Sequence, residues 1–258
     1  MSERRSTLPD FRILTPRGRL ELVDALRGLS ILLMVAYHVG YDLYLMEIVP
    51  QSLLFGPLLT ILQPFFAGVF ILLSGMSSRF SQNNIKRGGQ TLGCAFLVSL
   101  VSGIFGMTIW FGILHCLGLM MILHELWHRG IWPKKWKKIH MPLWASMLIW
   151  GALFAISFLL LPQYTRLFDR VPYMYVLGFI PSTWHSVADY FPLVPWIFLY
   201  GFGHELGKLV TRGRMPLWFY QIKIPLLPIV GRHTLLIYML HQPVVLLVLY
   251  FVLGGRTI

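Results

Sequence analysis

Long apolar runs separated by short polar connections dominate the chain. A helix needs about 17–25 mainly apolar residues to cross a hydrocarbon core roughly 30 Å thick. Runs of this length predict seven spans, at Leu22–Leu45, Leu53–Met76, Thr91–Met107, Trp110–Trp127, Leu143–Leu161, Phe191–Val210 and Thr234–Leu253. The sequence therefore predicts an all-α fold, a polytopic membrane bundle of about seven transmembrane helices.

One further apolar run, Val171–Pro181, is shorter and contains proline. Proline breaks or kinks a helix, so we expect this run to lie at the interface or to re-enter the membrane, with an eighth span as the alternative. We predict two regions, a basic cytoplasmic N-terminal segment at 1–21 and one transmembrane domain at 22–258. The spans and their short connections leave no room for a separate soluble domain.

The basic residues orient this bundle. Eighteen of the 22 lysines and arginines fall in the N-terminal segment and in alternate connections, which lie on one side of the membrane. Cytoplasmic loops carry the excess of lysine and arginine, so we expect a cytoplasmic N-terminus, an external C-terminus and a multi-pass protein of the inner (plasma) membrane. The same residues explain the net charge of +12, and attraction to anionic lipid accounts for it without a nucleic-acid partner.

Composition excludes a soluble domain. The chain is 56% hydrophobic and 12% charged, whereas soluble domains are about 45–50% apolar and about 25% charged. Its two cysteines, Cys94 and Cys116, lie in apolar runs at different predicted depths. We expect both to be free thiols, and we expect no metal cofactor, because two such cysteines cannot build a metal site.

The first predicted span carries ionisable residues, each costing on the order of 2.5–3.5 kcal/mol at the membrane centre when charged. Arg27 and His38 are eleven residues apart. Eleven steps of about 100° place them on one helix face, roughly 16 Å apart along the axis. Asp42 lies one turn beyond His38, beside Tyr41.

This stripe suits a reaction in which an anionic donor enters from inside and an acceptor arrives from outside. Neutral imidazole can remove a proton, and a nearby carboxylate can orient it, so His38 is the candidate base and Asp42 its partner. The alternative is structural: neighbouring helices satisfy the polar side chains, and Arg27 snorkels to the interface and pairs with Asp24.

Two more histidines lie within predicted spans. His115 falls at a depth similar to that of His38, where it could bind the acceptor or share a proton; a hydrogen bond within the bundle is the alternative. His241 comes shortly before Pro243 in the last span and is expected near mid-membrane. A proline there frees a carbonyl, which indicates a packed or water-lined setting.

Basic residues at the predicted cytoplasmic mouth are candidate contacts for a phosphate-bearing donor. They are Arg27, Arg87, Arg232 and His233, with snorkelling as the alternative for Arg232. The pairs His124-Glu125 and His204-Glu205 lie at the cytoplasmic ends of the fourth and sixth spans, where solvation at the interface explains them without catalysis. Ser74-Gly75 is expected to allow close helix packing.

Several short motifs follow one another along the chain at matching membrane depths. They are Leu26-Arg27-Gly28-Leu29, Tyr37-His38 with Tyr41-Asp42, Phe70 to Gly75, Phe111-Gly112-Ile113-Leu114-His115, and Gly231-Arg232-His233-Thr234 followed by His241-Gln242-Pro243. In these motifs the chain resembles the transmembrane acyltransferase superfamily. It is most similar to bacterial relatives of the heparan-α-glucosaminide N-acetyltransferase catalytic domain.

The resemblance implies acyl transfer across the membrane, from acetyl-CoA on the cytoplasmic side to a hydroxyl or amine, such as that of a sugar or glycan, outside. It gives His38 the catalytic role and Arg27 a role in holding the donor. We hypothesise an integral membrane, CoA-dependent O- or N-acyltransferase. His115 assists, and Tyr41 and His241 line the substrate path. Direct transfer and a route through acyl-His38 both remain open, as does a homo-oligomeric state.

Two other functions use the same residues. A proton-coupled transporter of small solutes would use Arg27, His38, Asp42 and His241 as its path, although the chain shows no inverted repeat. A haem-binding electron carrier would use histidines as axial ligands, although their predicted depths form no clear pairs.

Overall fold

The computed structural model describes residues 19–104, 106, 109–129, 141–164, 171, 173–179 and 189–253. Within these ranges every regular element is helical, which confirms the all-α prediction. The elements are α2 (Glu21–Leu45), α3 (Gln51–Leu54), α4 (Pro57–Ser77), α5 (Asn84–Ile104), α6 (Ile113–Arg129), α7 (Leu143–Tyr164), η3 (Met174–Leu177), α8 (Leu193–Thr211), α9 (Leu217–Gln221), α10 (Leu227–Arg232) and α11 (Thr234–Val252).

A long helix lies at each of the seven predicted spans. The second run is divided, because Pro57 starts a new helix and leaves α3 as a separate short turn before α4. Four helices are both long and apolar enough to cross a membrane: Glu21–Leu45, Pro57–Ser77, Leu143–Leu161 and Thr234–Val252. The length and apolar character of these helices are those of a membrane protein. The total of seven spans stays a prediction.

The helix at the third predicted run is longer than predicted, because it also includes polar residues on the N-terminal side of the run. Helix α5 begins at Asn84, seven residues before the predicted start, and its first turns pack on α6. Gly88 and Gly118 make this contact possible, because a Cβ at either would lie within 3.0 Å of the backbone oxygen of the other. The backbones therefore approach closely along a segment that is too polar to be identified as part of a span.

The run Val171–Pro181 is described only in part. Residues 174–177 form one 3-10 turn, flanked by Tyr173 and Gly178 with left-handed φ values of 65° and 108°. This turn is too short to cross a membrane. The remainder of the run lies outside the described residues, as does most of the N-terminal segment, so their predicted placement and the domain division are untested.

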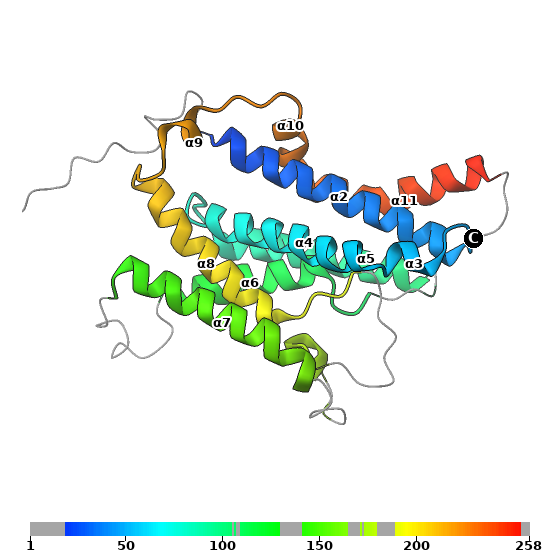
Figure 1. Cartoon of the computed structure of the whole chain (residues 1–258), viewed down its shortest axis with the longest axis horizontal. Coiled ribbons are helices and arrows are strands. Elements are labelled where there is room, and N and C mark those ends of the chain that lie inside the picture. Colours follow the sequence, from blue (N-terminus) through cyan, green and yellow to red (C-terminus); the bar gives the residue numbers. More distant parts are fainter. Residues whose placement is uncertain are drawn as a thin grey trace, which may run out of the picture.

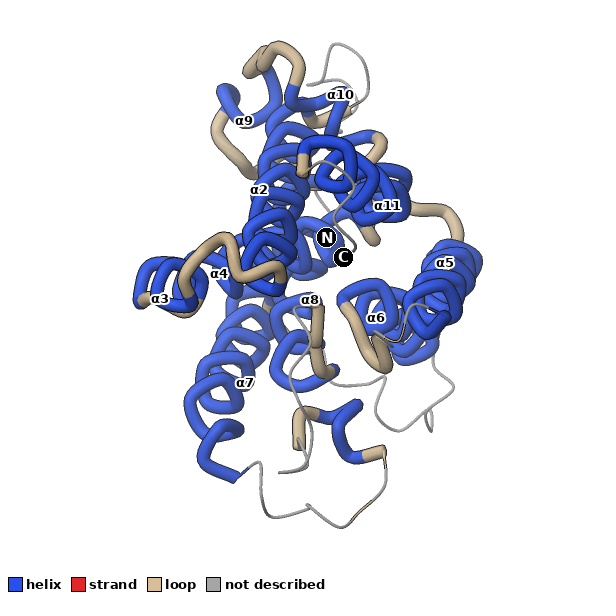
Figure 2. Tube along the Cα trace, turned by 90° about the vertical axis from the view of Figure 1, so that its right-hand side faces the viewer, coloured by secondary structure: helices blue, strands red, loops and turns tan. Residues whose placement is uncertain are grey.

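Helix α2 runs along the middle of the assembly and contacts α4, α10 and α11 (Figure 1). Helix α4 packs on α8, α7 packs on the outer side of α8, and α5 pairs with α6 (Figure 2). The main core lies between α4, α6 and α8, where Ile71, Cys116, Met120 and Tyr200 have no exposed surface. Both cysteines are free thiols, as predicted.

Helices α4 and α8 meet backbone to backbone. A Cβ at Gly75 would lie 2.1 Å from the carbonyl oxygen of Tyr200, and one at Gly203 would lie 2.2 Å from that of Leu72. A Cβ at either glycine could therefore be accommodated only if α4 and α8 moved apart. The packing role predicted for Ser74-Gly75 is therefore confirmed.

This contact predicts the effect of one added methyl group. We expect Gly75→Ala to destabilise the protein by about 1–3 kcal/mol, the usual cost of overpacking. Gly93→Ala is the matched control, because a Cβ there meets nothing within 4 Å. Thermal unfolding in detergent should show a lower midpoint for Gly75→Ala only, and equal midpoints for the two variants would contradict the contact.

Candidate functional site

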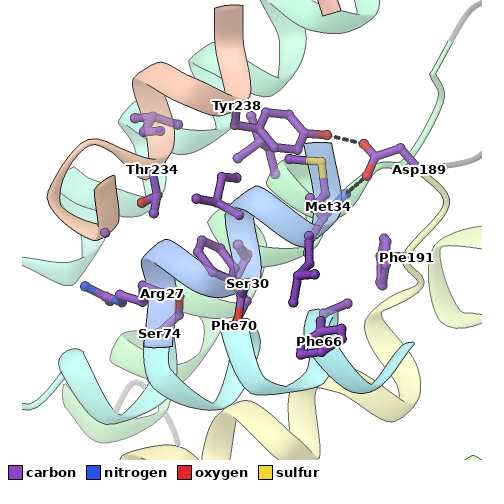
Figure 3. Close-up of a pocket in the computed structure, with 18 of the residues that line it drawn as sticks. Arg27, Ser30, Met34, Phe66, Phe70, Ser74, Asp189, Phe191, Thr234 and Tyr238 are labelled. Atoms are coloured by element: carbon purple, nitrogen blue, oxygen red, sulfur yellow. Dashed lines mark hydrogen bonds between the residues drawn. The ribbon is translucent and has the colours of Figure 1, made fainter. Parts of the chain in front are cut away.

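A cavity of about 890 Å³ follows one face of α2. Among the α2 residues that line it, Val23, Arg27, Ser30, Met34 and His38 recur every three or four positions. This is one stripe of an α-helix. Helices α4, α5, α6, α10 and α11 supply the other walls, and Figure 3 shows the middle of the cavity. The face shared by Arg27 and His38, predicted from their spacing, is therefore a cavity wall.

One end of the cavity is basic. Four arginines line it, Arg19, Arg27, Arg87 and Arg232, together with the acidic Asp24. The Arg232 Nε donates a 3.5 Å hydrogen bond to Asp24. The Nε of Arg27 is buried without a hydrogen-bond partner. Because a buried guanidinium needs acceptors, this end is built for an anionic group.

The middle of the cavity is mostly apolar. Phe66 and Phe70 come from α4, Ile31 from α2, and Leu114 and Leu117 from α6. Small polar side chains, Ser30 and Ser74, lie near Arg27 in Figure 3. This wall suits an elongated, weakly polar chain that extends from the basic end.

His38 lies toward the other end, and its hydrogen bond defines its tautomer. Its Nδ1 lies 2.9 Å from the Met34 carbonyl oxygen. A carbonyl only accepts, so Nδ1 carries the proton and Nε2 keeps a lone pair. The imidazole can therefore act as a base through Nε2.

His241 lies beside His38, with ring centroids 5.0 Å apart and the rings edge to face. Its Nδ1 donates to the Tyr238 carbonyl over 2.6 Å, and its Nε2 is buried without a partner. The structure thus places His241 beside His38, while its depth near mid-membrane stays a prediction. Helix α10 packs on the first turns of α2, and the chain then bends at His233 before α11 begins, which brings His241 level with His38.

Asp189 is a site residue that the sequence analysis missed. It lines the cavity, accepts a hydrogen bond from the Tyr238 hydroxyl, and lies 3.5 Å from the Ile113 backbone N–H (Figure 3). Burial raises the pKa of its carboxyl, while the charge of the nearby His38 acts in the opposite direction. The available signal was an acidic residue directly before the sixth apolar run.

Gly112 makes room for this carboxylate. A Cβ at this position would lie 2.2 Å from Asp189 Oδ2. The Phe111-Gly112-Ile113 motif is therefore explained by packing. Gly112 leaves space for the Asp189 carboxylate, and the backbone N–H of Ile113 faces that carboxylate.

Asp42 is buried and accepts two hydrogen bonds of 2.9 Å from Gln242 Nε2. These bonds join α2 to α11 just beyond the His38–His241 pair. The proton on His38 Nδ1 is donated to the Met34 carbonyl, so the structure does not show the predicted orientation of His38 by a hydrogen bond to Asp42. None of Asp42, Tyr41 and His241 is among the residues that line the cavity, so the predicted place of Tyr41 and His241 on the substrate path stays a prediction.

His115 faces α5 instead of the cavity. Its Nδ1 accepts from the Gly112 N–H over 3.2 Å, and its Nε2 lies 3.3 Å from Ser99 Oγ. Both ring nitrogens are thus occupied, so the geometry supports the structural alternative for His115. His233 ends α10 and precedes α11, also outside the cavity wall, whereas Arg27, Arg87 and Arg232 all line it.

A second group of histidines lies outside the cavity. His124 and His128 on α6 and His204 on α8 place one ring nitrogen each within 4.8 Å of the others. The sequence predicted separate positions at the membrane interface for His124 and His204. The signal was His124-Glu125 followed by His128, two histidines four residues apart on one helix face. The prediction of no metal cofactor was based on the two cysteines and did not include these histidines.

The apolar helices define a helical membrane protein, and the cavity gives it an internal ligand site that extends from a basic end to His38. The family model "Heparan-alpha-glucosaminide N-acetyltransferase, catalytic" matches residues 19–243, so the chain belongs to this family of membrane acetyltransferases. The match spans every residue of the cavity described above. No curated protein and no solved structure matches the chain.

The Asp42–Gln242 pair predicts a stability effect. We expect Gln242→Ala to cost about 1.5–3 kcal/mol, because hydrogen bonds to a charged group are lost and the carboxylate stays buried. Gln221→Ala, at an exposed position at the end of α9, is the control. Thermal unfolding in detergent measures both, and a Gln242→Ala midpoint equal to that of Gln221→Ala would show that the pair does not hold α11.

Proposed function

We propose that this protein is a CoA-dependent membrane acyltransferase that moves an acetyl group from acetyl-CoA to a hydroxyl or amine, with a sugar or glycan as the acceptor class. The observation that carries this proposal is the cavity itself. It joins an arginine-lined end to the Nε2 lone pair of His38 along a single face of α2.

The donor end fits the shape and charge of CoA. Phosphates would contact Arg27, Arg87 and Arg232, and a guanidinium binds phosphate oxygens through paired N–H donors. The unpartnered Nε of Arg27 supplies a free donor within the cavity wall. The pantetheine arm would then lie along the apolar middle, with its thioester reaching His38.

At His38, the acceptor O–H or N–H gives its proton to Nε2 while its oxygen or nitrogen attacks the thioester carbonyl. The tetrahedral intermediate then expels the CoA sulfur, which takes the proton from His38 and leaves as the thiol. The products are the acylated acceptor and CoA. The Asp189 carboxylate, close enough to His38 for a direct charge interaction, stabilises the imidazolium between these steps.

His241 and Asp42 serve this site in different ways. His241 places a second Nε2 acceptor beside the base, where it can receive the acceptor's hydrogen bond. Asp42 is a positioning residue, because its two bonds to Gln242 fix α11 and with it His241.

The predicted orientation puts the arginine-lined end in the cytoplasm, where acetyl-CoA is made, and His38 toward the outer side of the plasma membrane. The acceptor therefore approaches from outside. We propose direct transfer, because His38 and His241 together can take and hold the acceptor's proton without an acyl-enzyme.

The roles of the two ends can be separated by one pair of variants. We expect His38→Gln to bind acetyl-CoA normally and to lose about 10²–10⁴-fold of turnover, the usual contribution of a general base. We expect Arg27→Gln to weaken acetyl-CoA binding. The readouts are calorimetric binding and thioester hydrolysis or acyl transfer by the purified protein in detergent.

Arg129→Gln is the control for a lost arginine, because Arg129 is exposed at the end of α6 and pairs with Glu125. Folded wild-type protein that binds none of the acyl-CoAs tested would overturn the proposal and favour the transporter. Equal loss of acetyl-CoA binding in His38→Gln, Arg27→Gln and Arg129→Gln would contradict the proposal that one end of the cavity binds the donor and the other end carries the base.

Direct transfer predicts a second result. Incubation with radiolabelled acetyl-CoA in the absence of an acceptor should leave no label on the protein. Intact-protein mass spectrometry checks this. An acetyl adduct that maps to His38 and disappears on addition of acceptor would replace direct transfer with the two-step route.

A further inference from the structure

The three-histidine group on α6 and α8 has the composition of a transition-metal site. His124 and His204 are 6% and 5% exposed. The ring centroid of His204 lies 4.3 Å from that of His124 and 4.6 Å from that of His128. Two imidazoles buried in a helix contact are costly unless something satisfies their polar atoms.

Hydrogen bonding leaves a lone pair of His204 directed into the group. The Ser78 hydroxyl donates to the Gly75 carbonyl oxygen over 2.6 Å. Ser78 Oγ must therefore accept the 2.7 Å bond from His204 Nδ1, so Nδ1 carries the proton. The Nε2 of His204 keeps its lone pair and is buried without a partner. A ligating histidine is usually held in this way, with its other nitrogen bonded to the protein.

The other two histidines complete the set. The Nε2 of His124 is also buried and has no hydrogen-bond partner. His128 follows one turn later on the same face of α6, and it is the exposed member of the group. It gives an ion a route from solvent to the two buried nitrogens.

The spacing suits a small ion. The candidate nitrogens lie within 4.8 Å of one another. A tetrahedral Zn²⁺ with bonds of about 2.0–2.1 Å would hold them about 3.4 Å apart, so small side-chain rotations would close the site. Neutral imidazoles favour zinc and similar transition metals over Mg²⁺ or Ca²⁺, which prefer oxygen ligands.

The surrounding charges are partly balanced. Lys208 and Arg79 both lie close enough to affect His204 electrostatically. Lys208 is neutralised by Glu205, whose two carboxylate oxygens lie 2.6 and 2.7 Å from its Nζ. Arg79 adds a positive charge near the group, which favours an anionic ligand on a bound ion.

We propose that His124, His128 and His204 form a binding site for one Zn²⁺ ion, which ties α6 to α8 and leaves a fourth position for water or an anion. The site is separate from the cavity of the proposed acyl transfer, since none of its three ligands lines that cavity.

Glu125 distinguishes this site from a zinc hydrolase that uses a similar spacing of histidines. In such enzymes the glutamate after the first histidine activates the zinc-bound water. Here the Glu125 oxygens accept bonds of 3.0 Å from Asn84 and 2.8 Å from Arg129. The carboxylate is engaged away from the histidines, so we assign the ion a structural role.

The test is metal binding by the full-length protein, purified in detergent with its affinity tag removed and its metals stripped by chelator. Titration with Co²⁺ should give the intense visible absorption of a tetrahedral site at one equivalent per chain, and Zn²⁺ should abolish that absorption. Zn²⁺ should also raise the thermal unfolding midpoint.

His128→Gln is the main variant, because its exposed side chain can be changed without opening the core. We expect at least a tenfold loss of affinity and no thermal shift. His233→Gln, an exposed histidine outside the group, is the matched control and should behave as wild type. Folded wild type that binds no Co²⁺ or Zn²⁺, or His128→Gln that binds as tightly as wild type, overturns the site.

Ser78 tests the assigned tautomer as a positioning residue. We expect Ser78→Ala to weaken Zn²⁺ binding by about 10–100-fold and Ser78→Thr to restore it, because the hydroxyl orients His204. Ser78→Ala that folds and binds with unchanged affinity would contradict the assigned hydrogen bond and ligand geometry.

Discussion

The backbone contact between α10 and α2 places the cavity's basic end. A Cβ at Gly231 would lie 1.7 Å from the Asp24 carbonyl oxygen, and one at Gly28 would lie 2.3 Å from that of Leu227. With no side chain in between, α10 lies directly on α2 and holds Arg232 next to Asp24 and the cavity. Larger residues at either glycine would push α10 and its arginine outward.

Helix α2 is held at its other end by polar contacts with α11. There Asp42 bonds to Gln242, and His38, one turn before Asp42, meets His241, the residue before Gln242. The backbone contact and the carboxylate–amide pair therefore hold α2 against the C-terminal helices from both ends. Because α2 is held against α10 at one end and against α11 at the other, the helices cannot collapse into the space between these two contacts, and a long cavity remains open there.

Histidine tautomers separate the residues proposed to react from His115. In His38 and His241 a main-chain carbonyl occupies Nδ1 and Nε2 is left with a lone pair, as a base requires. His115 has both nitrogens engaged between α5 and α6, so the same residue type is structural there. The position of a histidine within a span does not predict which of its ring nitrogens keeps a lone pair. That depends on which neighbouring group faces each nitrogen.

The sequence by itself determined the helical fold and the stripe of α2 that carries Arg27 and His38. Both follow from local periodicity, which needs no knowledge of neighbouring helices. The motifs also indicated the family, which the match over residues 19–243 confirms. Only the tertiary structure decided that Asp189 enters the site, that Asp42 bonds to Gln242, and that His124, His128 and His204 meet. These contacts join residues up to 200 positions apart, and their geometry depends on helix packing, which the pattern of a single segment does not encode.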